Sequence, residues 1–485
     1  MSFLAMHPTE STQAESSTGR TRPIRLSNLP VEVLGEIFTV GYEDENQNQS
    51  PWPKGKPFEI LVSHISQHCR AIAHDTARLW TSIDANTRVA GTLDIAAGYI
   101  ERSKNLLVDV RVRLPSRSGT DHTSQQARIR TLLNILSPHS GRLESLKVEG
   151  RDQNCIECVI SGLQYGCARL KVLDIRHFGY SDTAWRPGAA FRDGLPKLQS
   201  LKLIGVDLGY LSVNRSITIL QLHGYYAHAL HTLRSNEHQS FTFLTHLIIK
   251  EADVEHWNGA PGYGSFDFPS LKVLNMRSFP HCARFLSDLV APQLETLYLA
   301  TTSELEMAMA DVATASFEAA TGSPKFPSMR HLIVHILDRR WPPLPPWYHL
   351  QRCFPDITHV WMLNADAGDF LESLLEQDDS TVPWMALDTL SMPNAEKDLI
   401  AETLTRRAAV GHPIRKLQVS QAVYDDEKGF FQRVNVVVEV VENAHTGLPV
   451  IGSSEDWEDL DDLDRGCDTP TPEDEEGERR WTRGR

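Results

Sequence analysis

The sequence predicts an α+β protein in which a small helical module precedes an irregular solenoid of strand-and-return units, curved like a horseshoe. Three observations predict this fold class. An apolar triplet recurs eleven times between residues 143 and 419, two helical patterns lie before it, and hydrophobic residues make up 41% of the 485 positions. With 23% charged residues, this composition supports a large buried core and excludes wholesale disorder.

The two ends of the chain differ in composition from the rest. Residues 1–23 are rich in Ser, Thr and Gly, and we expect a disordered arm. Residues 452–485 carry thirteen acidic side chains and five arginines, a net charge of −8. Such a segment buries too little apolar surface to offset its chain entropy, so we expect a disordered acidic tail.

A helical module is predicted over residues 24–84. Pro30 suits the first turn of a helix, where its missing N–H costs nothing. The apolar face of that helix consists of Leu34, Ile37 and Phe38. A second helix is predicted from Phe58 to Ala73, because apolar residues recur there at i, i+3, i+4, i+7, i+11, i+14 and i+15. A module this small leaves apolar surface uncovered, and we expect a partner to cover the surplus.

The apolar triplet dominates residues 105–440. It consists of an apolar residue, two spacers, a second apolar residue, one spacer and a third apolar residue. Successive copies are 19 to 35 residues apart, and most steps are 27 or 28. Their first positions are Leu143, Leu170, Leu198, Ile217, Leu244, Leu271, Leu294, Met329, Ile357, Leu387 and Ile414.

Each triplet predicts a short strand whose last two apolar residues point into a core. The remaining length allows a returning helix, and apolar residues from Ile156 to Cys167 have helical spacing. Neither element buries its apolar face alone, so stacked copies share one core. Val108, Val110 and Val112 are interpreted as a degenerate first strand, and an alternation from Val434 to Val438 is expected to close the array.

The residue between the two core positions of each triplet predicts a row along one face of the sheet. In the C-terminal half this row carries four apolar residues that we predict to be exposed anchors for a client protein: Ile248, Tyr298, Ile333 and Trp361. For Trp361 the alternative is that a neighbouring loop or the tail covers it. The neighbouring His331, His335 and His359 would make binding sensitive to pH.

No constellation of residues supports catalysis, and we predict neither a metal nor another cofactor. Cys155 and Cys158 have the spacing of metal ligands, with Cys167 downstream, but these cysteines lie on or beside a helical stripe that favours buried structural thiols. His223, His228 and His231 lie within one connection, where a polar surface role is preferred. A metal-dependent hydrolase using either cluster is kept as a remote alternative.

Charge and cysteine usage limit the partners and the compartment. The 48 Lys and Arg stand against 63 Asp and Glu, a formal net charge of −15, which disfavours nucleic acid. No apolar run approaches a membrane span, and residues 1–6 are too short for a secretory signal. Seven scattered cysteines suit a reducing compartment. We therefore expect an intracellular protein of the cytoplasm, the nucleus or both, without a membrane or nucleic-acid partner.

The triplet skeleton resembles the leucine-rich repeat family, although Gly150 and Gly205 take places where regular members carry Asn or Cys. The module in front resembles the F-box, on Leu29, Pro30, Glu32, Ile37, Phe38, Val62, Ser63, Arg70, Leu79 and Trp80. It departs from that family at Cys69, where tryptophan is usual, and in the longer connection 41–57. The whole layout resembles the F-box-like proteins of mushroom-forming fungi.

This resemblance implies a substrate-recognition subunit of an SCF-type ubiquitin ligase, acting in ubiquitin-dependent degradation. The module would dock a Skp-type adaptor, and through it a cullin, while the repeats recruit a client protein. The implied adaptor contacts are Leu29, Pro30, Ile37, Phe38, Val62 and Leu79. Two alternatives stay open: these residues only pack the core of the module, as we expect for Leu34, Ile65 and Trp80, or the protein is a repeat scaffold without a ubiquitin-ligase role.

Overall fold

The computed structural model forms two compact units, Met1–Leu79 and Trp80–Arg485. The predicted arm 1–23 and acidic tail 452–485 lie outside the residues that it describes. Those residues are 29–47, 57–87, 89, 91–114, 122–163, 166–178, 191, 195–206, 208, 216–224, 241–250, 265–277, 282–301, 324–336, 350–351, 354–363, 368–375, 384–393, 395–421, 423–425, 431 and 436–441.

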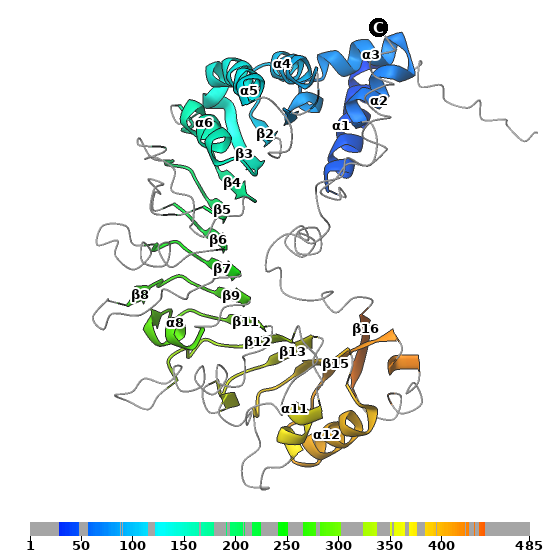
Figure 1. Cartoon of the computed structure of the whole chain (residues 1–485). Coiled ribbons are helices and arrows are strands. Elements are labelled where there is room, and N and C mark those ends of the chain that lie inside the picture. The colour runs from blue at the N-terminus through cyan, green and yellow to red at the C-terminus, as the bar shows by residue number, and fades with distance from the viewer. Residues whose placement is uncertain are drawn as a thin grey trace, which may run out of the picture. The chain divides into compact units, whose positions relative to one another are not determined.

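The first unit contains three helices: α1 (Val31–Gln47), α2 (Phe58–Ile65) and α3 (Gln67–Asp75) (Figure 1). As predicted, Pro30 precedes the first helical residue, and its carbonyl accepts a hydrogen bond from the Leu34 amide at 3.1 Å. Leu34 and Phe38, one turn apart, are buried. The helix continues beyond the expected limit, because the acidic stretch from Glu43 to Gln47 stays helical.

The single helix predicted from Phe58 to Ala73 is wrong, because the chain breaks at Ser66. This residue is extended, with φ −158° and ψ 166°, and its side chain accepts a hydrogen bond from the Cys69 amide at 3.0 Å. Ser66 therefore ends α2 and caps α3. The change of direction separates positions that would share one face of a continuous helix, so Val62, Cys69 and Ile72 are buried while Ile65 is exposed.

The second unit is built on a long parallel sheet. In the described part of the chain it has fourteen strands, which follow one another in chain order (Figure 1). They are β1 (Ser82–Asn86), β2 (Val108–Arg113), β3 (Leu143–Gly150), β4 (Val172–His177), β5 (Ser200–Ile204), β6 (Ile219–His223), β7 (His246–Lys250), β9 (Val273–Arg277), β11 (Thr296–Thr301), β12 (His331–Ile336), β13 (His359–Leu363), β14 (Thr389–Ser391), β15 (Lys416–Ser420) and β16 (Val437–Val441).

The register confirms the eleven predicted triplets. The middle apolar residue of each pairs with the middle apolar residue of the next, through the whole run Leu146, Leu173, Leu201, Leu220, Leu247, Leu274, Leu297, Leu332, Val360, Leu390 and Leu417. Because every pairing is parallel and helices occupy several of the returns, the fold is a mixed α/β repeat rather than an α+β arrangement.

The ends of the sheet were predicted less well. Strand β2 is the expected degenerate strand, but β1 precedes it and begins inside the segment 24–84 that is predicted as the helical module. Strand β16 pairs with β15, as expected of a closing strand, but begins at Val437. Val434 lies outside the described residues.

A turn that the sequence analysis missed leads into the strands. In seven units the amide of the first triplet residue donates to the carbonyl of the residue three positions earlier, at 2.9–3.2 Å, which is the hydrogen bond of a β-turn. The accepting residues are all buried: Cys167, Leu195, Phe241, Phe268, Ala291, Phe326 and Trp384. In four of these turns proline follows directly and fixes the backbone angle that the turn requires.

Helices occupy several of the connections between the strands. Near its start these are α4 (Thr92–Arg102), α5 (His122–Leu136) and α6 (Gln153–Leu163), the last being the predicted returning helix. Later come α8 (Cys282–Asp288), α11 (Gly368–Leu375) and α12 (Lys397–Ala409). Two 3₁₀ turns, η2 (Ala77–Trp80) and η3 (Ser137–Arg142), and a two-stranded sheet of β8 (Phe266–Asp267) and β10 (Leu289–Val290) complete the described elements. None of the described helices is both long and apolar enough to cross a bilayer.

Candidate functional site

An exposed apolar surface lies on the first two helices. Of fifteen large hydrophobic side chains exposed in the described part of the chain, six are on α1 and α2: Val31, Val33, Ile37, Val40, Leu61 and Ile65. Val33, Ile37 and Val40 have the spacing i, i+4, i+7 and therefore share one side of α1. We call these six residues the helical stripe. Exposed apolar surface of this kind is typical of a docking site.

The adaptor contacts implied by the F-box resemblance divide into two groups. Pro30 and Ile37 are exposed, and Leu29 is half-buried. Phe38, Val62 and Leu79 are buried in the core, so they cannot meet a partner in this conformation. The expected packing role is correct for Leu34 and Trp80 but wrong for Ile65, which is 59% exposed. The signal that we missed is the second apolar spacing on α1, formed by Val33, Ile37 and Val40.

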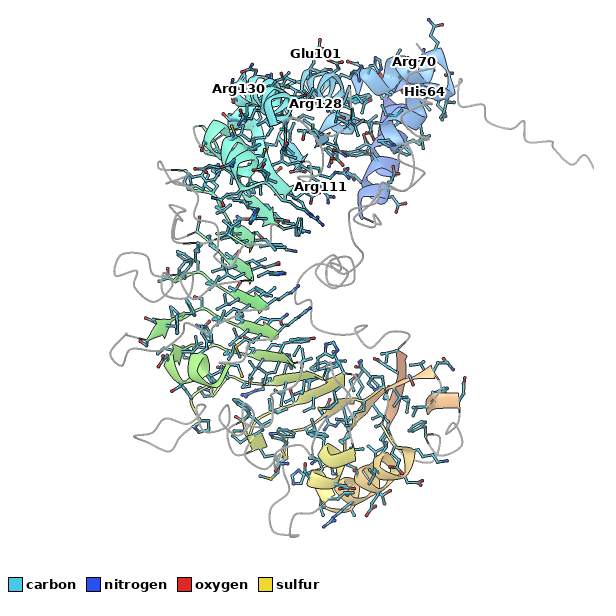
Figure 2. The ribbon with its side chains drawn as sticks, in the orientation of Figure 1. His64, Arg70, Glu101, Arg111, Arg128 and Arg130 are labelled. Carbon is cyan, nitrogen blue, oxygen red and sulfur yellow. The ribbon has the colours of Figure 1, made fainter. Side chains whose placement is uncertain are left out.

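Two local contacts fix the geometry behind the helical stripe. The Arg70 guanidinium, on α3, donates from Nε to the Ser63 carbonyl at 3.0 Å and so ties α3 to α2 (Figure 2). Gly41 lies against Phe58, and a Cβ atom there would come within 2.5 Å of the ring. Glycine at this position therefore allows α1 and α2 to approach closely.

A second candidate surface is one face of the long sheet. It carries the strand positions that alternate with the leucine core, and we call it the variable face. Near its start, its charges are paired. Arg111, labelled in Figure 2, donates from Nη2 to both carboxylate oxygens of Glu149 at 3.1 Å. Arg176 donates from Nε to both oxygens of Asp174 at 3.0 Å.

The four predicted client anchors lie on this face, but the expectation that they are exposed is wrong. Strand pairing places them in one row, with Ile333 between Tyr298 and Trp361. Tyr298 and Ile333 are fully buried, while Ile248 and Trp361 are 1% and 4% exposed. Neighbouring side chains cover them: the Arg277 guanidinium, on the adjacent strand β9, lies 4.9 Å from the Tyr298 ring centre, and the ring of His359, on β13 itself, stacks on Trp361 at 5.5 Å. The row is therefore part of the packing of the sheet.

Three histidines surround this buried row, as the sequence predicted. The His335 Nδ1 and the Tyr298 hydroxyl are hydrogen-bonded at 2.9 Å, and the rings of His331 and His359 meet edge-on at 4.8 Å. Burial lowers the pKa of His331 and that of His359. Both rings are half-buried, so they form part of an accessible row two residues before the buried one.

The cysteine cluster has the properties of structural thiols. The Cys155 Sγ lies 3.0 Å from the amide nitrogen of the Gln125 side chain, and burial raises the pKa of Cys155 to about 12. Burial likewise raises the pKa of Cys167 to about 11, and its Sγ lies 2.9 Å from the Leu163 carbonyl oxygen. A metal ligand or nucleophile must lose its proton, which these values oppose.

The described ranges contain no cluster of potential metal ligands. Within those ranges, no three His, Cys, Asp or Glu side chains gather as a metal site would require. His223 ends β6, while His228 and His231 of the same predicted cluster lie outside the described residues.

The chain has few similarities to known proteins. No known protein family matches the chain, and no curated protein matches it either. Among solved structures, the chain is similar to a crystal structure of a Bacteroides fragilis protein, with 11% sequence identity and a TM-score of 0.27, over 71% of this chain and 77% of that one. A likeness at this TM-score carries no argument about fold or function.

Proposed function

We propose that this protein is the substrate-recognition subunit of an SCF-type ubiquitin ligase. Its first helices would dock a Skp-type adaptor, and through it a cullin, while the repeat sheet would bind a client protein. The chain itself would be non-catalytic and would contribute proximity between the client and the recruited enzymes.

The helical stripe is the observation that carries this proposal. Six exposed apolar side chains on α1 and α2 leave much apolar surface in water, and a partner helix or groove would bury it. The F-box resemblance supplies the identity of that partner. Because Phe38, Val62 and Leu79 are buried, we place the adaptor contacts on Pro30, Val33, Ile37, Val40, Leu61 and Ile65 instead.

The client contacts also move from the predicted positions. The four apolar anchors are buried, whereas the strand position two residues earlier is accessible in several units. That accessible row is at least partly exposed at Val172, Ile219, His246, Val273, His331 and His359. Its mixture of apolar and imidazole groups suits recognition of a protein segment rather than of a small charged ligand.

Co-expression of the full chain with a Skp-type adaptor, followed by affinity capture, tests the proposal. We expect the wild type to capture the adaptor and the double variant Ile37→Asp, Leu61→Asp to capture at least tenfold less. Both positions are exposed, so the substitutions should leave the fold intact. Met385→Asp, at an even more exposed apolar site in the second unit, is the matched control and should capture as the wild type does.

Two results would contradict the ubiquitin-ligase proposal. One is a wild-type chain that captures no adaptor, which would favour a repeat scaffold without a ubiquitin-ligase role. The other is equal capture by the wild type and the double variant, which would move the contact away from the helical stripe.

A further inference from the structure

We infer that β16, the last strand of the parallel sheet, is a docking edge for one further strand, and that its occupant is the segment 448–451 of this same chain. The segment would pair antiparallel to β16 and cover the open end of the apolar core. The inference stands whether or not the helical stripe binds an adaptor.

One edge of β16 carries backbone groups that the sheet does not use. In the described part of the chain, β16 pairs with β15 alone. The Val437 amide donates to the Arg415 carbonyl at 2.8 Å, so Val437 directs its backbone groups toward β15. Because these directions alternate along a strand, Val438 and Val440 direct theirs away from β15. An additional strand is the partner that satisfies such a row of donors and acceptors.

The apolar core is also incompletely covered at this end of the sheet. Val438 and Val440 are the register partners of Leu417 and Val419, whose side chains are fully buried. Both valines on β16 are only half-buried, and Val437, on the variable face, is 63% exposed. The terminal unit of a repeat array needs a cover for its outer side. A strand beside β16 would remove this apolar surface from water.

Charge does not protect this edge from pairing. Glu439 is the single charged residue of β16, and its partners lie on the sheet side. Its carboxylate lies 2.8 Å from the Lys416 Nζ and accepts a hydrogen bond from the Gln418 Nε2 at 3.1 Å. Free charges, proline or a covering element usually protect an edge strand. With four valines and a paired glutamate, β16 instead suits an extended apolar partner.

The segment 448–451 has the composition and the position of that partner. It reads Leu-Pro-Val-Ile and follows β16 after the six residues 442–447, which include Asn443 and Gly447. Six residues are a common length for a connection, and asparagine and glycine both favour turns. A parallel neighbour would need a much longer crossover, so this connection allows an antiparallel strand.

Pro449 determines how the segment can lie against β16. Proline has no N–H, so it fits an edge strand where its nitrogen faces away from the neighbouring strand. Leu448 and Val450 then direct their backbone groups toward β16. The register that pairs Leu448 with Val440, and Val450 with Val438, satisfies the row of unused backbone groups. Opposite residues of antiparallel strands share a face, so these two side chains would also cover the open core.

The same register matches the residues on the variable face. It places Ile451 opposite the exposed Val437, and Pro449 opposite Glu439. A second copy of β16, paired about a two-fold axis with full overlap, would instead place Glu439 opposite Glu439, and like charges in that position are destabilising. The segment of the same chain is therefore the better occupant.

The closing strand would also end the sheet. Its outer edge would lack the N–H of Pro449, so it would be a poor template for a further strand. A client could then not add a strand at this end, which leaves the accessible row of the variable face for recognition.

Two proline variants of the full chain test the backbone pairing. Val450→Pro removes an N–H that would face β16, whereas Ile451→Pro removes one that would face outward. Hydrogen exchange resolved to single amides measures the protection of Val438 and Val440. We expect these two amides to exchange at least about tenfold faster in Val450→Pro than in the wild type, and at the wild-type rate in Ile451→Pro. Equal exchange in all three proteins, whether fast or slow, would overturn the inference.

Engineered disulfides test the register and the identity of the occupant. Val437→Cys with Ile451→Cys should crosslink on mild oxidation, because these residues would share a face with their Cα atoms about 4.5 Å apart. Val437→Cys with Val450→Cys is the matched control, since Val450 would lie on the opposite face. Mass spectrometry distinguishes the new bond from products of the seven native cysteines. We expect an intrachain bond in the first pair and little in the control. Equal crosslinking of both pairs would overturn the register, and bonds between two chains would overturn occupation in cis.

Discussion

At the scale of single residues, two glycines have left-handed backbones but different surroundings. Gly205 follows β5 with φ +65°, and a Cβ atom there would lie 2.5 Å from the His177 carbonyl oxygen. Gly411 follows α12 with φ +85°, and a Cβ atom there would meet nothing within 4 Å. The sequence singles out Gly205 as a substitute for the usual Asn, but the close approach of backbone from β4 emerges only from the structure.

We predict that Gly205→Ala destabilises the protein much more than Gly411→Ala does. The left-handed conformation alone should cost Gly411→Ala about 1 kcal/mol of unfolding free energy. Gly205→Ala adds a clash with backbone that cannot rotate away, and we expect a loss of about 3 kcal/mol. Urea unfolding, monitored by circular dichroism, measures the loss of unfolding free energy in each variant. Equal losses would show that the turn after β5 can relax around a methyl group.

At the scale of elements, Trp361 on β13 shows what the buried row contributes. Its ring is 4% exposed, packs with Tyr298 and Ile333, and stacks on His359. The indole Nε1 has no hydrogen-bond partner in the described part of the chain, so this side chain acts through its apolar area.

We predict that Trp361→Ala lowers the free energy of unfolding by about 4 kcal/mol, because it leaves a cavity between three strands. Trp361→Phe should cost only about 1 kcal/mol, since it keeps most of the packing and removes an unsatisfied donor. Denaturant midpoints of the two variants provide the measurement. A destabilisation by Trp361→Phe as large as that by Trp361→Ala would mean that the indole N–H has a partner after all.

The strands were predictable from sequence because one pattern of leucine spacing sets both the strand and its neighbour. Each triplet faces the next at the same register, so eleven local signals combine into one sheet. The turns before the strands also have a sequence signal. It is an apolar residue, often followed by proline, three positions before the first apolar residue of the triplet.

The burial of the candidate sites was not predictable in the same way. Whether Tyr298 is exposed depends on side chains from neighbouring strands that are distant in sequence, such as Arg277 and His335. Likewise, a single backbone break at Ser66 decides which residues of α2 point outward. Periodicity gives the face of an isolated element, but the neighbours of that face come from the tertiary structure.

At the scale of the whole molecule, the variable face connects stability with pH. Four histidines on it have a lowered pKa in the folded state, for which burial is the first cause: His223, His246, His331 and His359. As pH falls through 6.5, the unfolded chain binds protons before these folded sites do. Protonation therefore favours unfolding, and this contribution lowers stability on the acid side.

We predict that His223→Gln gains stability relative to the wild type when the pH is lowered from 7.5 to 5.5. His223 pairs with Lys250 on β7, and Lys202, Arg176 and Arg277 also act on its ring, so a proton on that ring adds a fifth positive charge. Urea unfolding of the two proteins at both pH values separates the contribution of His223 to the pH dependence of stability from that of the other titrating groups. A constant difference in stability across that pH range would contradict the prediction.

The constant register also bears on how such a protein diversifies. The chain advances 19 residues from Leu201 to Leu220 but 35 from Leu297 to Leu332, and in both cases the two leucines are register partners on adjacent strands. An inserted repeat unit therefore has only to match the register of its two neighbouring strands, whatever the length of its connection. Duplications and deletions during evolution should therefore involve whole repeat units. Aligned genes from related species should differ by complete units more often than by parts of a unit.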